Sequence, residues 1–169
     1  MAASINGIGA FVPDKVITNS DLEKLIDTSD EWIRSRTGIA ERRVVSDGEN
    51  ASDLAIKSAE KALKTAKIRK EDVDLVLVAT ASPEMIFPST SCRVAHKLGI
   101  KNIPAFDISA ACSGFVYGLA VGAQFINAGT YKTVLLIGTE ALSRFVDWTD
   151  RNTCVLFGDG AGAVVLEEA

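Results

Sequence analysis

Two continuous apolar runs constrain the fold of this chain most strongly. Residues Asp74–Thr80 read DLVLVAT and residues Thr133–Thr139 read TVLLIGT, and both runs are rich in valine and leucine. Strands of this composition are buried on both faces, as in a parallel sheet that helices cover on either side. The two runs therefore predict strands at the centre of an α/β layered domain.

The remaining segments alternate between strand and helix patterns. Ala51–Ala66 is the clearest amphipathic helix, because its apolar residues recur three or four positions apart and lysines occupy the other face. The other expected helices are Asn19–Ile26, Ser29–Arg36 and Pro88–Leu98. The other expected strands are Ser4–Phe11, Glu41–Val45, Ile103–Ile108, Thr153–Phe157 and Ala161–Glu167, the last two paired as a hairpin. The glycine-rich run Gly158–Gly162 precedes a strand, so it indicates a tight hairpin turn and not a phosphate loop, which opens a helix.

The segment Ile108–Tyr131 carries no charged residue. Its length is compatible with a membrane span, but its serines, glycines, Gln124 and Asn127 favour a helix buried in the middle of a layered domain and ending near Gly129.

Composition narrows the classes of function. The 169 residues fit one domain, and the 47% of hydrophobic residues suffice for a sizeable core. The net charge of −4 gives no reason to expect a nucleic-acid or membrane partner. The first residues lack the pattern of a secretory signal, and the three cysteines form no CxxC pair, so we expect reduced thiols and a cytoplasmic location. The sequence stops directly after an expected strand, which hints that the natural polypeptide continues.

Cys112 is the main candidate for chemistry. It lies where an expected strand turns into an expected helix, with small neighbours on both sides. The free N–H groups and the positive end of the helix dipole at such a position stabilise a thiolate. On spacing alone, the role of a small buried hydrophobe remains the more frequent alternative.

Cys92, Cys154 and His96 are the other side chains with potential for this chemistry. We expect Cys92 on the apolar side of its helix and Cys154 within a strand, both in the core, and His96 on a helix surface. One histidine and no cysteine cluster predict no metal site.

A local basic cluster follows an aromatic residue in an otherwise acidic chain. Trp32 precedes Arg34 and Arg36 in the run WIRSRTG, and Arg42 and Arg43 follow. Guanidinium groups suit phosphates and an indole stacks on a purine, so this cluster fits either a nucleotide-like ligand or a solvated loop.

Taken together, the chain resembles the β-ketoacyl-acyl-carrier-protein synthase III family of the thiolase-like superfamily from end to end. The matching segments are Gly7–Pro13, Asp30–Ile39, Pro88–Thr90, Asp107–Phe115, Asp150–Arg151 and Thr153–Gly162. The resemblance implies a thiolase-like layered fold, with a mixed sheet covered by helices and a buried central helix. Residues 1–169 are then the amino-terminal one of two similar halves, and the second half is absent.

The resemblance also implies an activity, an acyltransferase that initiates fatty acid biosynthesis. An acyl-CoA, with acetyl-CoA expected, transfers its acyl group to Cys112, and the acyl-enzyme condenses with malonyl-acyl-carrier protein. The backbone N–H of Cys112 would help form the oxyanion hole. Coenzyme A is then a substrate and not a permanent cofactor, and the enzyme is expected to be a homodimer.

The family's pattern assigns further site residues. Coenzyme A would be held by Thr28, Trp32, Arg36, Thr37, Arg151 and Asn152, with Trp32 and Arg151 flanking the adenine. The acyl pocket would be walled by Leu142, Leu156 and Phe157, and Phe87 would reach into the partner's pocket across the dimer interface.

The family's catalytic His and Asn lie in the second half, so we expect this chain alone not to condense. The alternatives are a related condensing enzyme, such as hydroxymethylglutaryl-CoA synthase or a polyketide priming enzyme, and a non-catalytic module that keeps the fold.

Overall fold

The computed structural model describes residues 2–169, whose elements follow in chain order. The strands are β1 (Ala3–Phe11), β2 (Val16–Thr18), β3 (Glu41–Arg43), β4 (Leu75–Ala79), β5 (Ala105–Ile108), β6 (Thr133–Ala141) and β7 (Asp159–Glu168). The helices are α1 (Asn19–Leu22), α2 (Asp30–Thr37), α3 (Ala51–Ala66), α4 (Thr90–Leu98) and α5 (Gly114–Asn127). Short 3-10 turns are η1 (Lys70–Asp72), η2 (Ala111–Ser113) and η3 (Leu142–Arg144).

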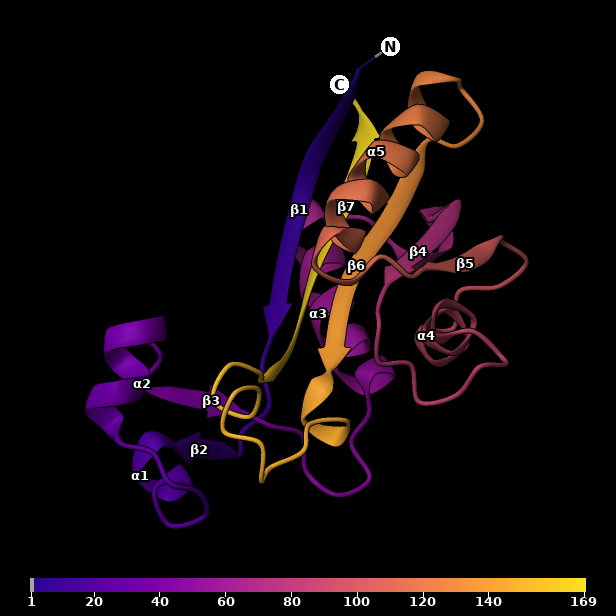
Figure 1. Ribbon diagram of the computed structural model, residues 1–169. Helices are drawn as coiled ribbons and strands as arrows, with labels where there is room; N and C mark the ends of the chain where they lie inside the picture. Colours follow the sequence, from indigo (N-terminus) through magenta and orange to yellow (C-terminus); the bar gives the residue numbers. More distant parts are fainter. Residues whose placement is uncertain (1) are drawn as a thin grey trace.

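The main sheet is mixed and has five strands in the order β1-β7-β6-β4-β5 (Figure 1). Strand β4 runs parallel to β5 and β6, whereas β7 runs antiparallel to both β6 and β1. The two apolar runs of the sequence are the neighbouring strands β4 and β6, and every residue of β4 is buried. The prediction of central strands in an α/β layered domain is therefore confirmed.

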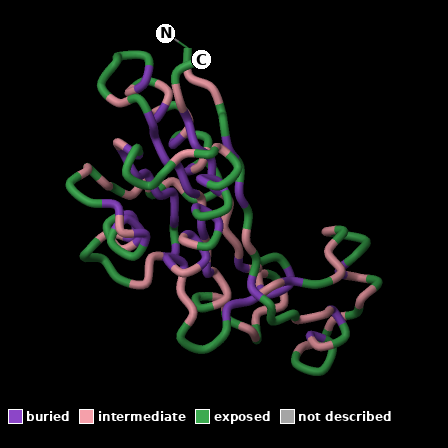
Figure 2. The backbone as a smooth tube through the Cα atoms, turned by 180° about the vertical axis from the view of Figure 1, so that it is seen from behind, coloured by how far each residue is buried: buried purple, intermediate pink, exposed green. Residues whose placement is uncertain are grey.

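Helices cover the two faces of this sheet. Alternate residues of β4 point to opposite sides, so Val76 and Val78 pack with α3 and α4 while Leu75 and Leu77 pack with α5. Figure 1 shows α5 in front of the sheet and α3 behind it. The buried positions run along the strands between these layers, as the view from behind shows (Figure 2).

Two glycines let α3 approach β1 closely. A Cβ atom on Gly9 would meet the carbonyl oxygen of Ser58, and one on Gly7 would meet the carbonyl oxygen of Ala62. Both carbonyls belong to α3. The helix backbone therefore lies against the strand backbone with no room for side chains between them.

A smaller lobe lies beside one end of the main sheet (Figure 1). It consists of the antiparallel pair β2–β3 with α1 and α2. The chain segment that leads into β7 packs against them. Leu22, Ile33, Cys154 and Val155 form its buried core. Two distant parts of the sequence, residues 17–39 and residues 146–155, thus share one small hydrophobic cluster.

The segment Thr153–Phe157 differs from its prediction, because it forms turns and not a strand. The backbone N–H groups of Thr153 and Cys154 both bond to the carbonyl oxygen of Asp150, at 3.2 and 3.0 Å. The expected hairpin is therefore wrong, and β7 pairs with β6 and β1 instead. The apolar side chains that suggested a strand are explained by the core of the smaller lobe.

Two expected elements are shorter than predicted. Helix α1 ends at Leu22. The backbone N–H groups of Leu25 and Ile26 both bond to the carbonyl oxygen of Leu22, at 2.9 Å each, so the chain continues in turns. Strand β3 ends at Arg43, and the expected Glu41–Val45 strand does not continue beyond it. The other predicted helices and strands are present with bounds shifted by at most two residues.

Helix α5 is buried on one side only. Gly114, Gly118, Gly122 and Ile126 face the sheet, whereas Val116 and other residues of the opposite side are exposed. Residues 2–169 supply no second layer over the exposed side of α5. Of the helices within residues 2–169, none combines the length and apolar composition that crossing a bilayer requires.

Candidate active site

Cys112 lies in the tight turn η2 that joins β5 to α5. The preceding residue, Ala111, has a φ of 44°, in the left-handed region that non-glycine residues rarely adopt. Strand-to-helix turns of this kind present a nucleophile at the end of a sheet, next to the first N–H groups of a helix. The Cys112 side chain is exposed, unlike the small buried hydrophobe that spacing alone suggested.

An open cavity of about 530 Å³ adjoins Cys112. It lies at the carboxyl ends of the parallel strands β4 and β6, the edge at which α/β sheets bind their ligands. Its lining is mostly small or apolar: Ala79, Ala81, Ala111, Cys112, Phe115, Gly138, Thr139, Glu140, Leu142, Phe157, Gly160, Ala161 and Gly162.

Two of the four expected acyl-pocket residues, Leu142 and Phe157, line this cavity with Cys112. The other two do not. Leu156 is about half exposed and lies outside the lining, and Phe87 is 87% exposed on the loop before α4. Within this chain, therefore, Phe87 is not part of the Cys112 cavity.

Glu140 is a cavity residue that the sequence analysis missed. Its carboxylate accepts a hydrogen bond from the backbone N–H of Ala81 at 2.8 Å and another from the hydroxyl of Ser82. Ser82 in turn accepts the N–H of Ala141 at 2.8 Å. The carboxylate thus fixes the loop after β4 to the end of β6. In the sequence, the signal for this residue is a single acid at the carboxyl end of an apolar strand.

A second group of expected residues meets on the smaller lobe. Trp32 and Arg36 project from α2, and the Arg36 guanidinium carbon lies 4.8 Å from the centroid of the indole ring. Arg151 comes from the distant segment before β7, and its guanidinium carbon lies 4.1 Å from the same ring. We call Trp32, Arg36 and Arg151 the cation–aromatic cluster. It places two positive charges beside one aromatic plate, as a purine nucleotide with phosphates requires.

Hydrogen bonds shape the backbone around this cluster. The hydroxyl of Thr37 donates to the carbonyl oxygen of Ile33 at 2.8 Å and accepts the N–H of Ile39 at 3.0 Å, which closes the end of α2. The carboxylate of Asp150 accepts the Thr153 hydroxyl at 2.7 Å and the Asn152 N–H at 3.0 Å. These two bonds, with the Thr153 hydroxyl contributing most, hold the pKa of Asp150 below its usual range.

Two of the expected ligand residues have a buried side-chain atom that forms no hydrogen bond within residues 2–169. The Oγ1 atom of Thr28 is buried without a hydrogen-bond partner, and so is the Nε atom of Arg151. Asn152 is exposed at the surface of the same segment. Polar atoms of this kind have hydrogen-bonding capacity for a bound molecule.

Arg42 and Arg43, which follow Trp32 in the sequence, form hydrogen bonds with other parts of the protein. Arg42 is only 5% exposed and bonds within the lobe, so the expectation of a surface position is wrong for it. Arg43 donates to the carbonyl oxygens of Pro13 and Asp14, at 3.3 and 3.4 Å. Arg42 thus joins parts of the lobe from inside, whereas Arg43 bonds to the link between β1 and β2.

The other cysteines and the histidine lie away from the Cys112 cavity. Cys92 is exposed on α4, so its predicted core position is wrong. Cys154 is buried as predicted, but in a turn, and burial raises the pKa of its thiol. His96 is exposed on α4, as predicted. The run Gly158–Gly162 does not form the predicted tight hairpin turn, because from Asp159 onward it is part of β7.

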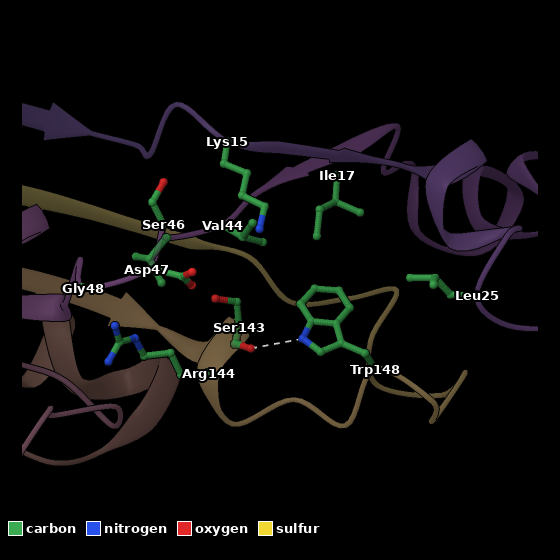
Figure 3. A pocket seen from close by; sticks show the side chains of 11 residues that line it. Lys15, Ile17, Leu25, Val44, Ser46, Asp47, Gly48, Ser143, Arg144 and Trp148 are labelled. Carbon is green, nitrogen blue, oxygen red and sulfur yellow. Dashed lines mark hydrogen bonds between the residues drawn. The ribbon is translucent and has the colours of Figure 1, made fainter.

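A further cavity, of about 580 Å³, lies between β2 and η3 (Figure 3). Lys15, Asp47 and Arg144 supply charged side chains to its lining, and the Trp148 indole N–H donates to the carbonyl oxygen of Ser143 at 3.2 Å. Neither Cys112 nor the cation–aromatic cluster lines this cavity.

Comparison with known proteins gives a consistent result. The family model of 3-oxoacyl-[acyl-carrier-protein] synthase III matches residues 106–169. A curated β-ketoacyl-[acyl-carrier-protein] synthase III from Bacillus pumilus is 56% identical over 168 residues, which cover 99% of this chain and 54% of that protein.

Solved structures agree with the sequence comparison. The 3-oxoacyl-[acyl-carrier-protein] synthase III of Aquifex aeolicus superposes with a TM-score of 0.96 at 52% identity, over 99% of this chain and 54% of that one. The priming β-ketosynthase of the R1128 polyketide pathway gives 0.97 at 34% identity, over 99% and 50% of the two chains. The chain spans about half the length of the curated relatives that it matches. By sequence and by fold, the chain is similar over nearly its whole length to about half of a β-ketoacyl-acyl-carrier-protein synthase III.

Proposed function

We propose that this chain supplies the nucleophile and much of the coenzyme A site of a β-ketoacyl-acyl-carrier-protein synthase III. The observation that carries the proposal is the exposed Cys112 in a strand-to-helix turn beside an open cavity, in a chain 56% identical to such an enzyme. Residues 1–169 would form the amino-terminal half of a longer cytoplasmic enzyme. The initiation of fatty acid biosynthesis is the corresponding pathway.

The first chemical step is acyl transfer to Cys112. Its sulfur attacks the thioester carbonyl of an acyl-CoA, here acetyl-CoA, and a new carbon–sulfur bond replaces the bond to coenzyme A. The proton that leaves the cysteine ends on the departing coenzyme A thiol. The backbone N–H of Cys112 contributes to the oxyanion hole, where developing negative charge needs a fixed donor. Leu142 and Phe157, which line the cavity beside Cys112, would enclose the acyl chain.

The nucleotide end of coenzyme A would bind at the smaller lobe. Trp32 and Arg151 flank the adenine, and the guanidinium groups of Arg36 and Arg151 neutralise phosphate charge. Thr28, Thr37 and Asn152 complete the polar contacts. The guanidinium of Arg151 lies against the indole, so it would move away from the ring to admit a base.

The second step requires partners beyond this chain. Malonyl-acyl-carrier protein would lose carbon dioxide, and the resulting carbanion would attack the acyl-cysteine. The His and Asn that polarise the malonyl carbonyl in this family belong to the second half. A homodimer would bring Phe87 into the partner's acyl pocket, consistent with its position outside the Cys112 cavity of its own chain.

A second candidate function is polyketide priming. It is favoured by the TM-score of 0.97 with the priming β-ketosynthase, although that protein is only 34% identical. The first step is the same in both functions, and they differ in the acyl group and in the carrier protein.

The proposal is tested by incubating the purified chain with acetyl-CoA and mapping the acetyl group by peptide mass spectrometry. We expect an acetyl thioester on Cys112, no adduct in Cys112→Ala, and an unchanged yield in Cys92→Ala. Cys92 is a suitable control because it is also exposed. Acetylation of Cys92 in equal yield, or none at either residue, would contradict the proposal.

A further inference from the structure

A buried arginine connects the two segments that carry the cation–aromatic cluster. Arg42 on β3 is 5% exposed. Its Nη2 atom donates to the side-chain oxygen of Asn19 at 2.7 Å and to the carbonyl oxygen of Val155 at 3.4 Å. Its Nη1 atom donates to the carbonyl oxygen of Ile17 at 3.2 Å. One guanidinium group therefore bonds to α1, to β2 and to the segment before β7.

Asn19 extends this connection to α2. It is only 1% exposed, and its amide nitrogen donates to the carboxylate of Asp30 and to the carbonyl oxygen of Ile39, at 2.8 Å each. Asp30 is the first residue of α2, and Ile39 follows its end. A single buried amide thus fixes both ends of the helix that carries Trp32 and Arg36.

Through these hydrogen bonds, Arg42 and Asn19 together connect the two chain segments that carry the cation–aromatic cluster. Val155 lies four residues after Arg151, in a segment whose turns bond back to Asp150. Arg42 holds that segment at Val155, and Asn19 holds α2. The spacing of Arg151 and Trp32, 4.1 Å from guanidinium carbon to ring centroid, therefore depends on a chain of hydrogen bonds that neither residue makes.

We propose that Asn19 and Arg42 are positioning residues for the nucleotide portion of coenzyme A. The inference rests on the proposed function, since it assumes that the cation–aromatic cluster binds this portion. Buried networks with a charged member resist rearrangement, and removal of one member leaves the others unpaired. Loss of either side chain would let α2 and the segment before β7 separate, which would spoil the geometry that a flat base requires.

The test compares two acyl donors that differ only in the nucleotide. Acetyl-CoA carries it, whereas acetyl-pantetheine lacks it and reaches Cys112 without the cluster. The rate of Cys112 acetylation is measured by mass spectrometry across donor concentrations for the original chain, Asn19→Ala, Asn19→Asp and Arg42→Lys. Arg42→Lys retains the positive charge and a donor, so it is the variant least prone to unfold, whereas Asn19→Asp keeps the acceptor for Arg42 but places a carboxylate oxygen against Asp30.

We expect the variants to raise the KM for acetyl-CoA by about tenfold or more, because misplacement by ~1 Å in a binding geometry costs up to ~10²-fold. The maximal rate and the rate with acetyl-pantetheine should stay unchanged. The matched control is Arg93→Lys, which alters a partly buried arginine on α4 that is paired with Glu84, and it should change neither rate.

Equal losses with both donors in all three variants would overturn the inference, since the network would then support folding alone. Unchanged kinetics with acetyl-CoA would overturn it as well. Failure of the original chain to react with either donor would instead contradict the proposed function and remove the inference with it.

Discussion

The backbone around Cys112 explains why this thiol, among three, is suited to nucleophilic attack. Cys92 is also exposed and lies in the first turn of a helix, but it does not line the cavity beside Cys112. Cys154 is fully buried, and burial raises the pKa of its thiol. Only Cys112 combines exposure, a helix start and a cavity with room for an acyl group. At this scale, reactivity is set by position and not by residue type.

The position of Arg151 beside Trp32 leads to a prediction about the affinity for coenzyme A. Arg151→Ala removes the guanidinium beside Trp32 that would neutralise phosphate charge, and a hydrogen bond to a charged group contributes ~1.5–3 kcal/mol, so we expect the affinity for coenzyme A to fall by roughly tenfold or more. Lys57→Ala is a matched control, because Lys57 lies over the ring of Phe11, 4.3 Å from its centroid, at a different place. Isothermal titration calorimetry measures both. Equal effects of the two substitutions would argue against a nucleotide site at Trp32.

Some site residues were accessible from the sequence and others were not. Trp32 and Arg36 share one helix, so their proximity follows from their spacing of four. Arg151 joins them only through the tertiary fold, which the resemblance implied and the residue pattern did not. Arg42 was misjudged because its environment comes from Asn19 and Val155, which are 23 and 113 positions away.

The contact between β1 and α3 yields a prediction at the scale of elements. Gly9→Ala would force a Cβ atom against the carbonyl oxygen of Ser58, so we expect a loss of ~1–3 kcal/mol in the free energy of unfolding. Gly162→Ala is the matched control, because nothing lies within 4 Å of the added atom and the backbone is also that of a strand. Urea denaturation followed by circular dichroism compares them, and a Gly9→Ala variant as stable as the control would disprove the close approach.

The start of α2 gives a prediction about acid stability. The Asn19 amide and then the Arg34 guanidinium donate to Asp30 and lower its pKa. An unfolded aspartate titrates near ~3.9, so the ionised carboxylate stabilises the fold fully above that pH, and this contribution is lost as the pH falls through the lower folded pKa. Asp30→Asn should therefore destabilise the chain at neutral pH and differ less from the original at low pH. Urea midpoints measured across this range test the sign, and a constant difference at all pH values would contradict it.

Helices and strands were predictable where the apolar residues of a segment recur with a single period. The helix Ala51–Ala66 has the predicted bounds, because its apolar residues keep one face for four turns. Thr153–Phe157 was misread because a short apolar run fits either a strand or a buried turn. The segment forms turns because the carbonyl oxygen of Asp150 accepts two of its backbone N–H groups.

The whole molecule has one well-covered face and one open face. Helices α3 and α4 cover one side of the sheet, while α5 covers only part of the other. Large apolar side chains remain exposed there: Ile5 and Ile8 on β1, and Val116 and Tyr117 on α5. We propose that the second half of the enzyme covers this face, because exposed apolar patches of this kind mark interaction sites.

This open face predicts association of the isolated chain. The double variant Ile8→Lys, Val116→Lys should bind less of a fluorescent apolar dye and sediment closer to its monomer mass than the original chain. Leu25→Lys, at an equally exposed position of the smaller lobe, serves as the control and should change little. Addition of the second half should reduce dye binding by the original chain. Identical dye binding by all three proteins would show that the face is not apolar in solution.

We propose that Cys112 and the cation–aromatic cluster belong to one site that a single coenzyme A molecule spans. The most direct measurement is the rate of alkylation of each cysteine by iodoacetamide, followed by peptide mass spectrometry, with and without saturating coenzyme A. We predict that coenzyme A slows alkylation of Cys112, leaves that of the exposed Cys92 unchanged, and that the buried Cys154 stays unmodified in both cases. Equal rates at Cys112 with and without coenzyme A, under conditions where calorimetry shows binding, would contradict the claim.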